Sequence, residues 1–159
     1  MVEVTLLGVA QDGARPQAGC IQPCCAGLTS DDTMFPVSLG IIDDSGAGHL
    51  IEATRYLGEQ FRIWGASSLD SVWLTHAHFG HVDGLGLFGK ETMASRDLDL
   101  HVSDEMFHLM EETPQWALML KQGVFQDKVF QNGERITKNE NFSIIPIVIP
   151  HRDELSDMH

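Results

Sequence analysis

Short runs rich in apolar and β-branched residues recur along this chain, and the first of them, Val2–Gly8, alternates with the period of two that is typical of half-buried β-strands. Two of these runs flank Asp44-Ser45-Gly46-Ala47-Gly48, whose small, turn-forming residues predict a hairpin. The predicted strands are Val2–Gly8, Val37–Asp43, His49–Ala53, Ser71–Thr75, Leu98–Val102, Val124–Phe130 and Phe142–Ile149. The last of them is nearly all apolar, so we expect it to be a buried, central strand.

Apolar residues recur at helical spacing between several of these strands. Helices are predicted at Tyr56–Trp64, from Leu85 to Glu91, after an N-cap at Ser103, and at Thr113–Lys121. Met106, Met110 and Met119 fall at helical spacing among leucines, which predicts core positions. Hairpins followed by strands alternating with helices predict an α/β or α+β layered domain.

The composition indicates one globular domain over residues 1–159. Its 23 acidic and 10 basic residues give a formal net charge of −13, which argues against nucleic acid and anionic membranes as partners. A small phosphate-containing substrate remains compatible, because a bound metal would dominate the local field. The three cysteines lie within six positions and do not form a disulfide framework, so we expect reduced thiols in a cytoplasmic protein.

Three histidines follow the predicted strand Ser71–Thr75 directly. In His76-Ala77-His78 the spacing of two places both imidazoles on one side of an extended backbone. His81 returns to the same side if the chain turns into a helix. Three neutral imidazoles at the end of a strand suit Zn²⁺ with a position left for water, and Mn²⁺ or Fe²⁺ are alternatives.

The segment Leu74–Gly84 resembles the His-x-His-x-Asp-His signature of the metallo-β-lactamase superfamily. The resemblance implies an αββα sandwich in which His76 and His78 bind a first metal and His81 a second. Gly80 stands where the family has an aspartate ligand, which puts the second metal in doubt. His81 is then a candidate proton carrier or a group that orients a ligand.

Further site residues follow from the same resemblance. His151 fits the family's next ligand, because it comes directly after the apolar run 147–150. Asp83 is a candidate catalytic acid that partly compensates for the glycine. Glu52 matches an acid beneath the family's metal pocket, and its alternative is a solvated acid at the end of a strand.

The residues from Leu7 to Gly27 resemble those of the pyrroloquinoline-quinone biosynthesis protein B family and, more loosely, the cyclic phosphodiesterases of phosphonate use. Those proteins hold a structural zinc with Cys-x-Cys-x-x-Cys. Here Cys20 and Cys25 are in register, Gln22 replaces the middle cysteine, and Cys24 is additional. The cysteines are therefore either ligands of a structural Zn²⁺ or partly buried free thiols.

The resemblance covers about the first three-fifths of the family's length, and we expect the chain to be a sandwich that is incomplete at its C-terminus. An unfinished sandwich exposes a sheet face, so we expect a homo-oligomer. Asp157 and His159 are expected on a frayed tail. His49, His101 and His108 are expected to be structural, with His101 pointing outward from its strand.

Three functions fit these observations. The first is a metal-dependent hydrolase that acts on a small phosphodiester or related ester through a metal-activated water. The second is a metal-binding accessory or biosynthetic protein similar to pyrroloquinoline-quinone biosynthesis protein B. The third is a catalytically inactive fragment that folds by oligomerising.

Overall fold

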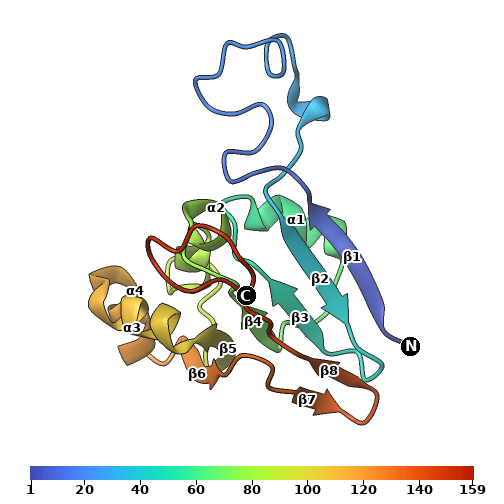
Figure 1. Cartoon of the computed structure of the whole chain (residues 1–159). Helices are drawn as coiled ribbons and strands as arrows, with labels where there is room; N and C mark the ends of the chain where they lie inside the picture. The colour runs from blue at the N-terminus through green and yellow to red at the C-terminus, as the bar shows by residue number, and fades with distance from the viewer.

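A six-stranded mixed sheet forms the centre of the computed structural model, which describes residues 1–159 (Figure 1). The spatial order of its strands follows the sequence, and the first three strands pair antiparallel while the others pair parallel. The strands are β1 (Glu3–Gly8), β2 (Ser38–Ile42), β3 (Gly48–Ile51), β4 (Ser71–Trp73), β5 (Leu98–Ser103) and β6 (Phe125–Phe130). The six corresponding predictions, and the hairpin that joins β2 to β3, are confirmed.

The helices connect the parallel strands and lie on one face of the sheet (Figure 1). They are α1 (Leu57–Trp64), α2 (Phe79–Val82), α3 (Asp104–Glu112) and α4 (Pro114–Lys121), with the 3-10 helix η2 (Leu85–Phe88). A second 3-10 helix, η1 (Ser30–Asp32), lies apart from them in the loop between β1 and β2 (Figure 1). Ser103 caps α3 by accepting a hydrogen bond from the backbone N–H of Met106. The helix expected from Leu85 to Glu91 is only the four-residue η2, because Gly89 ends it in an extended conformation.

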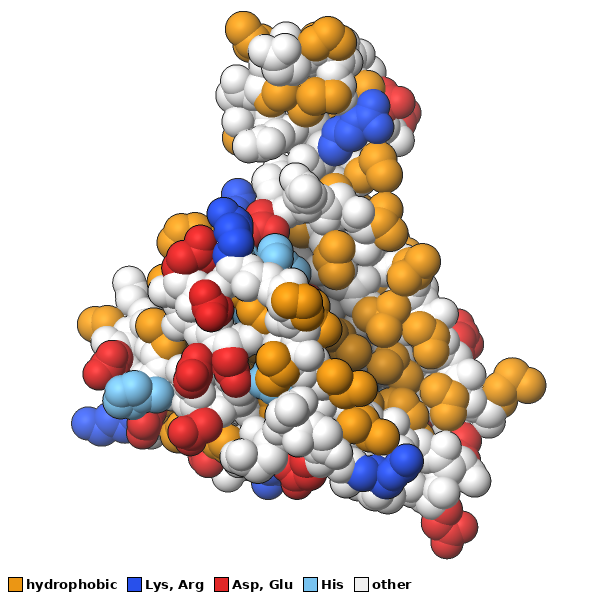
Figure 2. Space-filling model, in the orientation of Figure 1, with side chains coloured by type: hydrophobic (Ala, Val, Ile, Leu, Met, Phe, Trp, Pro, Cys, Tyr) orange, Lys and Arg blue, Asp and Glu red, His pale blue; other side chains and the backbone are white.

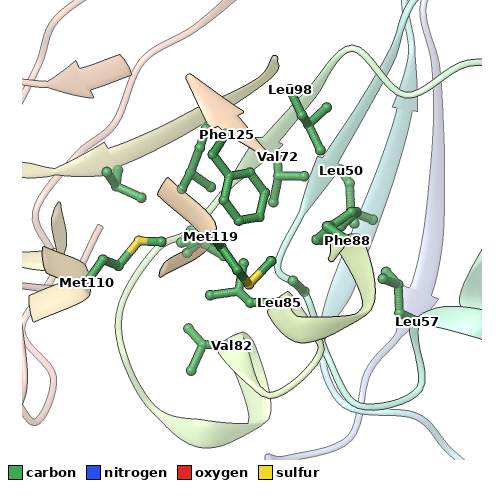
Figure 3. Close-up of a cluster of buried hydrophobic side chains, with 14 of the residues drawn as sticks. Leu50, Leu57, Val72, Val82, Leu85, Phe88, Leu98, Met110, Met119 and Phe125 are labelled. Atoms are coloured by element: carbon green, nitrogen blue, oxygen red, sulfur yellow. The ribbon is translucent and has the colours of Figure 1, made fainter. Parts of the chain in front are cut away.

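The core lies between this sheet and the helices as one cluster of 19 buried residues (Figure 3). Leu50 and Val72 project from the sheet, and Phe88 and the three methionines 106, 110 and 119 project from the helical side. The core positions predicted for these methionines are confirmed, since all three are buried. None of the chain's helices combines the length and the apolar character that a membrane-spanning segment needs.

The prediction of a central strand at Phe142–Ile149 is wrong. Only β8 (Phe142–Ile144) is a strand, and it pairs with β7 (Ile136–Asn139) in a separate two-stranded sheet. The rest of the run is irregular, with Ile147 60% and Ile149 51% exposed. Its apolar side chains therefore belong to the surface, and hydrophobicity alone could not distinguish this from burial.

The face of the sheet opposite the helices carries exposed apolar side chains (Figure 2). Val4 and Leu6 of β1 are 58% and 69% exposed, and further hydrophobic side chains extend over β2 and β3 in the same view. We call this surface the open sheet face. It lacks the polar covering that a two-layer domain normally presents to water.

Two irregular segments lie at the upper end of the sheet: an N-terminal loop that projects away from it, and the C-terminal segment, which folds back near α2 (Figure 1). The loop from Val9 to Val37 is held at its base by bridges between Ala10 and Pro36 and between Arg15 and Met34. The C-terminal segment is anchored by a hydrogen bond of 3.2 Å from the Ala77 backbone N–H to Ser156 Oγ. The expectation of a frayed tail is therefore wrong.

Candidate metal centre

The end of β4 presents the histidines of the motif to solvent-accessible space. The chain leaves β4 in an extended conformation and turns into α2 only after His78, which is the N-cap residue. His76, His78 and His81 consequently point to one side, and His151 reaches them from the C-terminal segment. The His76 ring lies 4.6 Å from that of His78, 4.0 Å from that of His81 and 5.6 Å from that of His151.

The hydrogen bonds around His76 and His78 leave two acceptor nitrogens facing each other. His76 Nδ1 lies 2.8 Å from Thr75 Oγ1, whose own hydroxyl donates to Glu52. His78 Nε2 lies 3.3 Å from the Glu154 carboxylate. These partners assign the imidazole protons to His76 Nδ1 and His78 Nε2. The lone pairs of His76 Nε2 and His78 Nδ1 then face each other across 3.1 Å.

Two ligand nitrogens on one tetrahedral zinc ion are separated by about 3.3 Å, given bonds of about 2.0–2.1 Å. The distance between His76 Nε2 and His78 Nδ1 is close to this value, and His76, His78 and His151 each offer one nitrogen within 4.8 Å of the others. Facing lone pairs repel unless a cation lies between them, so this donor set fits a divalent transition metal. Burial and the neighbouring imidazoles lower the pKa of His76 to about 4, which keeps it in the neutral, metal-binding form at pH 7.

Glu52 lies beneath the histidine cluster and contacts both Thr75 and His81. Its side chain accepts hydrogen bonds from the backbone and hydroxyl of Thr75, and one oxygen lies 3.2 Å from His81 Nδ1. Glu52 is 1% exposed, which excludes the alternative of a solvated acid at the end of a strand. Its φ of 68° is unusual for a residue with a side chain, and such strain is common at functional sites.

His81 lies between two carboxylates, with Nδ1 toward Glu52 and Nε2 3.5 Å from Asp12 Oδ1. Nδ1 has no partner at an acceptable hydrogen-bond angle, so we treat its contact with Glu52 as electrostatic. Burial opposes protonation of His81, but Glu52 and Asp12 together outweigh it and raise the pKa of His81. This environment suits a group that holds a proton or faces a cation.

Other residues expected at the site lie elsewhere. Asp83 forms an ion pair with Arg55 and lines neither of the two cavities beside the histidines, so it has no part in our proposal.

The expectation that His101 points outward is wrong, because it is buried and stacks on Trp73 with ring centroids 3.6 Å apart. Large aromatic neighbours on the adjacent strand make this stacking more favourable than exposure.

A buried chain of Asp43, His49 and Ser71 resembles a nucleophilic triad in composition only. His49 lies 3.3 Å from Asp43 and 2.7 Å from Ser71 Oγ, but all three side chains are buried beneath the β7–β8 hairpin. Asn139 of that hairpin donates a hydrogen bond of 2.7 Å to Asp43. With no access for a substrate, the cluster serves to fix the hairpin to the sheet.

The three cysteines meet in the N-terminal loop, with Cys24 Sγ 3.8 Å from Cys25 Sγ and one atom of each of the three within 4.8 Å. Thiolates around one zinc ion, bound at about 2.3 Å, are separated by about 3.8 Å. A hydrogen bond from the backbone of Gln17 is the main cause that lowers the pKa of Cys25. The spacing therefore permits a metal, although Cys20 and Cys24 remain partly or fully exposed.

Two cavities flank the histidines. One, of about 460 Å³, has an apolar wall that belongs to the open sheet face, including Leu6 and Ile51. The other, of about 750 Å³, lies under the N-terminal loop and is lined by Asp12, Arg15 and Arg152 together with His78, His81 and His151. A substrate bound here would meet imidazoles, two guanidinium groups and an apolar surface.

The sequence analysis missed Asp12 and Glu154, which contact His81 and His78. Both come from irregular segments more than sixty residues away, so no local spacing connects them to the motif. One signal was available for Asp12: a glycine between two histidines of the motif indicates that another backbone approaches closely.

Solved structures with the same architecture define the fold. The zinc-bound PqqB of Methylobacterium extorquens superposes with a TM-score of 0.80 at 17% identity, covering 94% of this chain and 52% of that protein. A diphosphatase of the PhnP family superposes with a TM-score of 0.71 at 20% identity, covering 99% of this chain and 61% of that protein. The metallo-β-lactamase fold protein YhfI of Bacillus subtilis superposes with a TM-score of 0.57 at 16% identity, covering 87% of this chain and 49% of that protein. This chain has the metallo-β-lactamase fold, as the histidine motif predicts.

Comparison of the sequence with known proteins gives less information than comparison of the structure. No family model matches the chain. A curated protein of Porphyromonas gingivalis, described as an octanoyltransferase, is 39% identical over 80 residues, which are 50% of this chain and 16% of that protein. The chain thus spans a small part of this relative and about half to three-fifths of the first two solved structures.

Proposed function

We propose that this chain binds a divalent transition metal, most suitably zinc, through His76, His78 and His151, and acts as a metal-dependent hydrolase of a phosphodiester or related ester. The observation that carries this proposal is the pair of facing lone pairs on His76 Nε2 and His78 Nδ1, 3.1 Å apart. Mn²⁺ and Fe²⁺ are alternatives for the same donor set. The likeness to a PhnP-family diphosphatase supports phosphate-ester chemistry.

When bound, such a metal lowers the pKa of a coordinated water to about 7 and polarises the substrate. The chain's own residues would orient the imidazole ligands and neutralise the charge of the substrate. Glu52 and Thr75 fix the His76 ring, and Glu154 fixes that of His78. Arg15 and Arg152 line the larger cavity in a chain of net charge −13, which suits recognition of a phosphate group.

The test combines metal content with turnover of a generic phosphodiester, bis(p-nitrophenyl) phosphate. The zinc-loaded protein should hydrolyse it slowly. The double variant His76→Ala, His78→Ala should lose both the metal of this centre and the turnover, whereas His108→Ala on an exposed helical surface should lose neither. An unchanged rate in the double variant would refute the proposal.

A second candidate is a metal-binding accessory or biosynthetic role, in the manner of PqqB. Two observations favour it: the TM-score of 0.80 to zinc-bound PqqB and the clustered thiols of the N-terminal loop. Stoichiometric metal at the histidines without phosphodiester turnover would support this role over the hydrolase. The free thiols also favour a reducing, cytoplasmic setting, which we include in the proposal.

We further propose that a second copy of the chain covers the open sheet face. Leu6 is 69% exposed there, and the apolar surface continues into the smaller cavity beside His76. Contiguous apolar patches of this kind usually mark interaction surfaces. The metal centre would then lie next to the interface.

A further inference from the structure

Position 80 has no side chain, and another residue occupies the space that a side chain would take. A Cβ atom built on Gly80 would lie 2.3 Å from Asp12 Cα, 2.5 Å from Asp12 Cβ and 2.8 Å from Asp12 Cγ. All three distances are shorter than any real contact. The absence of a side chain at position 80 is therefore what allows Asp12 to lie against α2.

The N-terminal loop holds Asp12 in this place through backbone hydrogen bonds. Ala14 N–H donates to Gln11 C=O at 2.8 Å and closes a turn around Asp12. Hydrogen bonds of 3.0 and 2.9 Å from the backbones of Val9 and Ala10 to Phe35 tie the start of the turn to the other side of the loop. Asp12 is thus directed at the site by the fold of the loop and not by a chance side-chain orientation.

His81 Nε2 and the Asp12 carboxylate are two groups of the kind that ligate metals, and they face each other. Glu52 lies 3.2 Å from His81 Nδ1 and attracts a proton to that nitrogen, so Nε2 is the nitrogen that a metal ion would take. Asp12 Oδ1 lies 3.5 Å from Nε2, and a cation bound between them would replace the proton that the two carboxylates favour on His81. The separation is close to the value of about 3.3 Å expected for two ligands on one ion.

The space beside this pair is open to a ligand. Asp12 and His81 both line the cavity of about 750 Å³, and the side chain of Asp12 is 45% exposed. His81 also stands next to the first metal centre, with its ring 4.0 Å from that of His76. An ion between Asp12 and His81 would therefore be a neighbour of the first ion.

We infer that Asp12 and His81 Nε2 form a second divalent-cation site, in which the N-terminal loop supplies the carboxylate that position 80 cannot carry. This inference builds on the proposed metal centre but rests on different atoms. Two protein ligands leave several positions for water, so the second ion binds more weakly than the first.

The experiment is a Zn²⁺ titration of chelator-stripped protein by calorimetry, with bound metal counted by elemental analysis. Asp12→Ala should bind one ion fewer than the wild type, or bind its last ion at least about tenfold more weakly. Asp31→Ala is the matched control, because Asp31 is an exposed acid of the same loop whose only side-chain contact is with Ser30. The cysteine cluster is unchanged in both variants, so it cancels in the comparison.

The outcomes separate this inference from the proposed function. Equal stoichiometry and affinities in Asp12→Ala and wild type would overturn the second site and leave the first intact. Retention of all bound metal in the double variant His76→Ala, His78→Ala would instead overturn the first centre. A second variant, Gly80→Ala, displaces Asp12 without removing it and should reproduce the loss seen in Asp12→Ala.

Discussion

Replacing Gly80 by alanine tests the arrangement of loop and motif with a single methyl group. Ordinary van der Waals contact begins at 3.4 Å, whereas the added Cβ would lie 2.3 Å from Asp12 Cα. The Asp12 backbone therefore has to move by about 1 Å, and overpacking of this kind costs about 1–3 kcal/mol. Alanine also favours a helix over glycine by up to about 1 kcal/mol, which offsets part of the cost.

Gly58→Ala is a matched control that separates the cost of the clash from the helical preference of alanine. Gly58 lies in helix α1 and nothing is within 4 Å of its built Cβ, so this variant gains the helical preference without a clash. The difference in unfolding free energy between the two variants should then be about 1–3 kcal/mol, from the clash alone. For a chain of this length that corresponds to about 2–4 °C in Tm per kcal/mol.

Urea unfolding and a Zn²⁺ titration on both variants complete the assay. The loop is irregular and projects from the sheet, so we expect it to yield before α2 does and to withdraw Asp12 from His81 (Figure 1). Gly80→Ala should thus lose metal affinity together with stability. If both alanine variants show the same change in stability and the same metal affinity as wild type, Asp12 does not lie against Gly80.

Three further predictions concern the centre, the buried network and the open sheet face. The double variant His76→Ala, His78→Ala should lose most of the metal bound at the histidines, and elemental analysis of protein purified without chelator measures this; unchanged stoichiometry would contradict the ligand assignment. Burial and then Lys138 lower the pKa of His101 to about 3, below its unfolded value near 6.5, so its contribution to stability is present above pH 6.5 and is lost as pH falls toward 3. His101→Phe keeps the stacking on Trp73 and should flatten the decline of unfolding free energy between pH 6.5 and 4, while an unchanged slope would assign the decline to other groups. Sedimentation equilibrium at low micromolar concentration should show a dimer or larger assembly that Leu6→Lys dissociates, and a monomeric wild type would contradict the proposed self-association.

The sequence predicted those parts of the fold that local periodicity determines. Short β-rich runs predicted the strands of the main sheet, and the spacing of the methionines predicted the core side of α3 and α4. The motif His76-Ala77-His78 was placed correctly because a strand end and a helix start fix its direction locally. These features depend on neighbours within a few residues.

The errors arose where distant segments decide the outcome. The run Phe142–Ile149 is apolar enough for a buried strand, but it does not pair with any strand of the main sheet, and Ile147 and Ile149 stay exposed. His101 is buried because Trp73 on the neighbouring strand stacks on it. Glu154 reaches His78 from the C-terminal segment, a contact that no spacing in the motif could indicate.

One buried acid connects the two halves of the centre. Through Thr75, Glu52 fixes the proton of His76 and so directs its Nε2 toward His78. The same carboxylate faces Nδ1 of His81 and so directs the opposite nitrogen toward Asp12. Both outward lone pairs thus depend on the charge of Glu52, and its left-handed backbone, held by a 2.9 Å hydrogen bond from its N–H to Trp73, places that charge beneath both rings. A neutral side chain at this position would weaken the contacts that orient both imidazoles, so the two proposed metal sites would be coupled through Glu52.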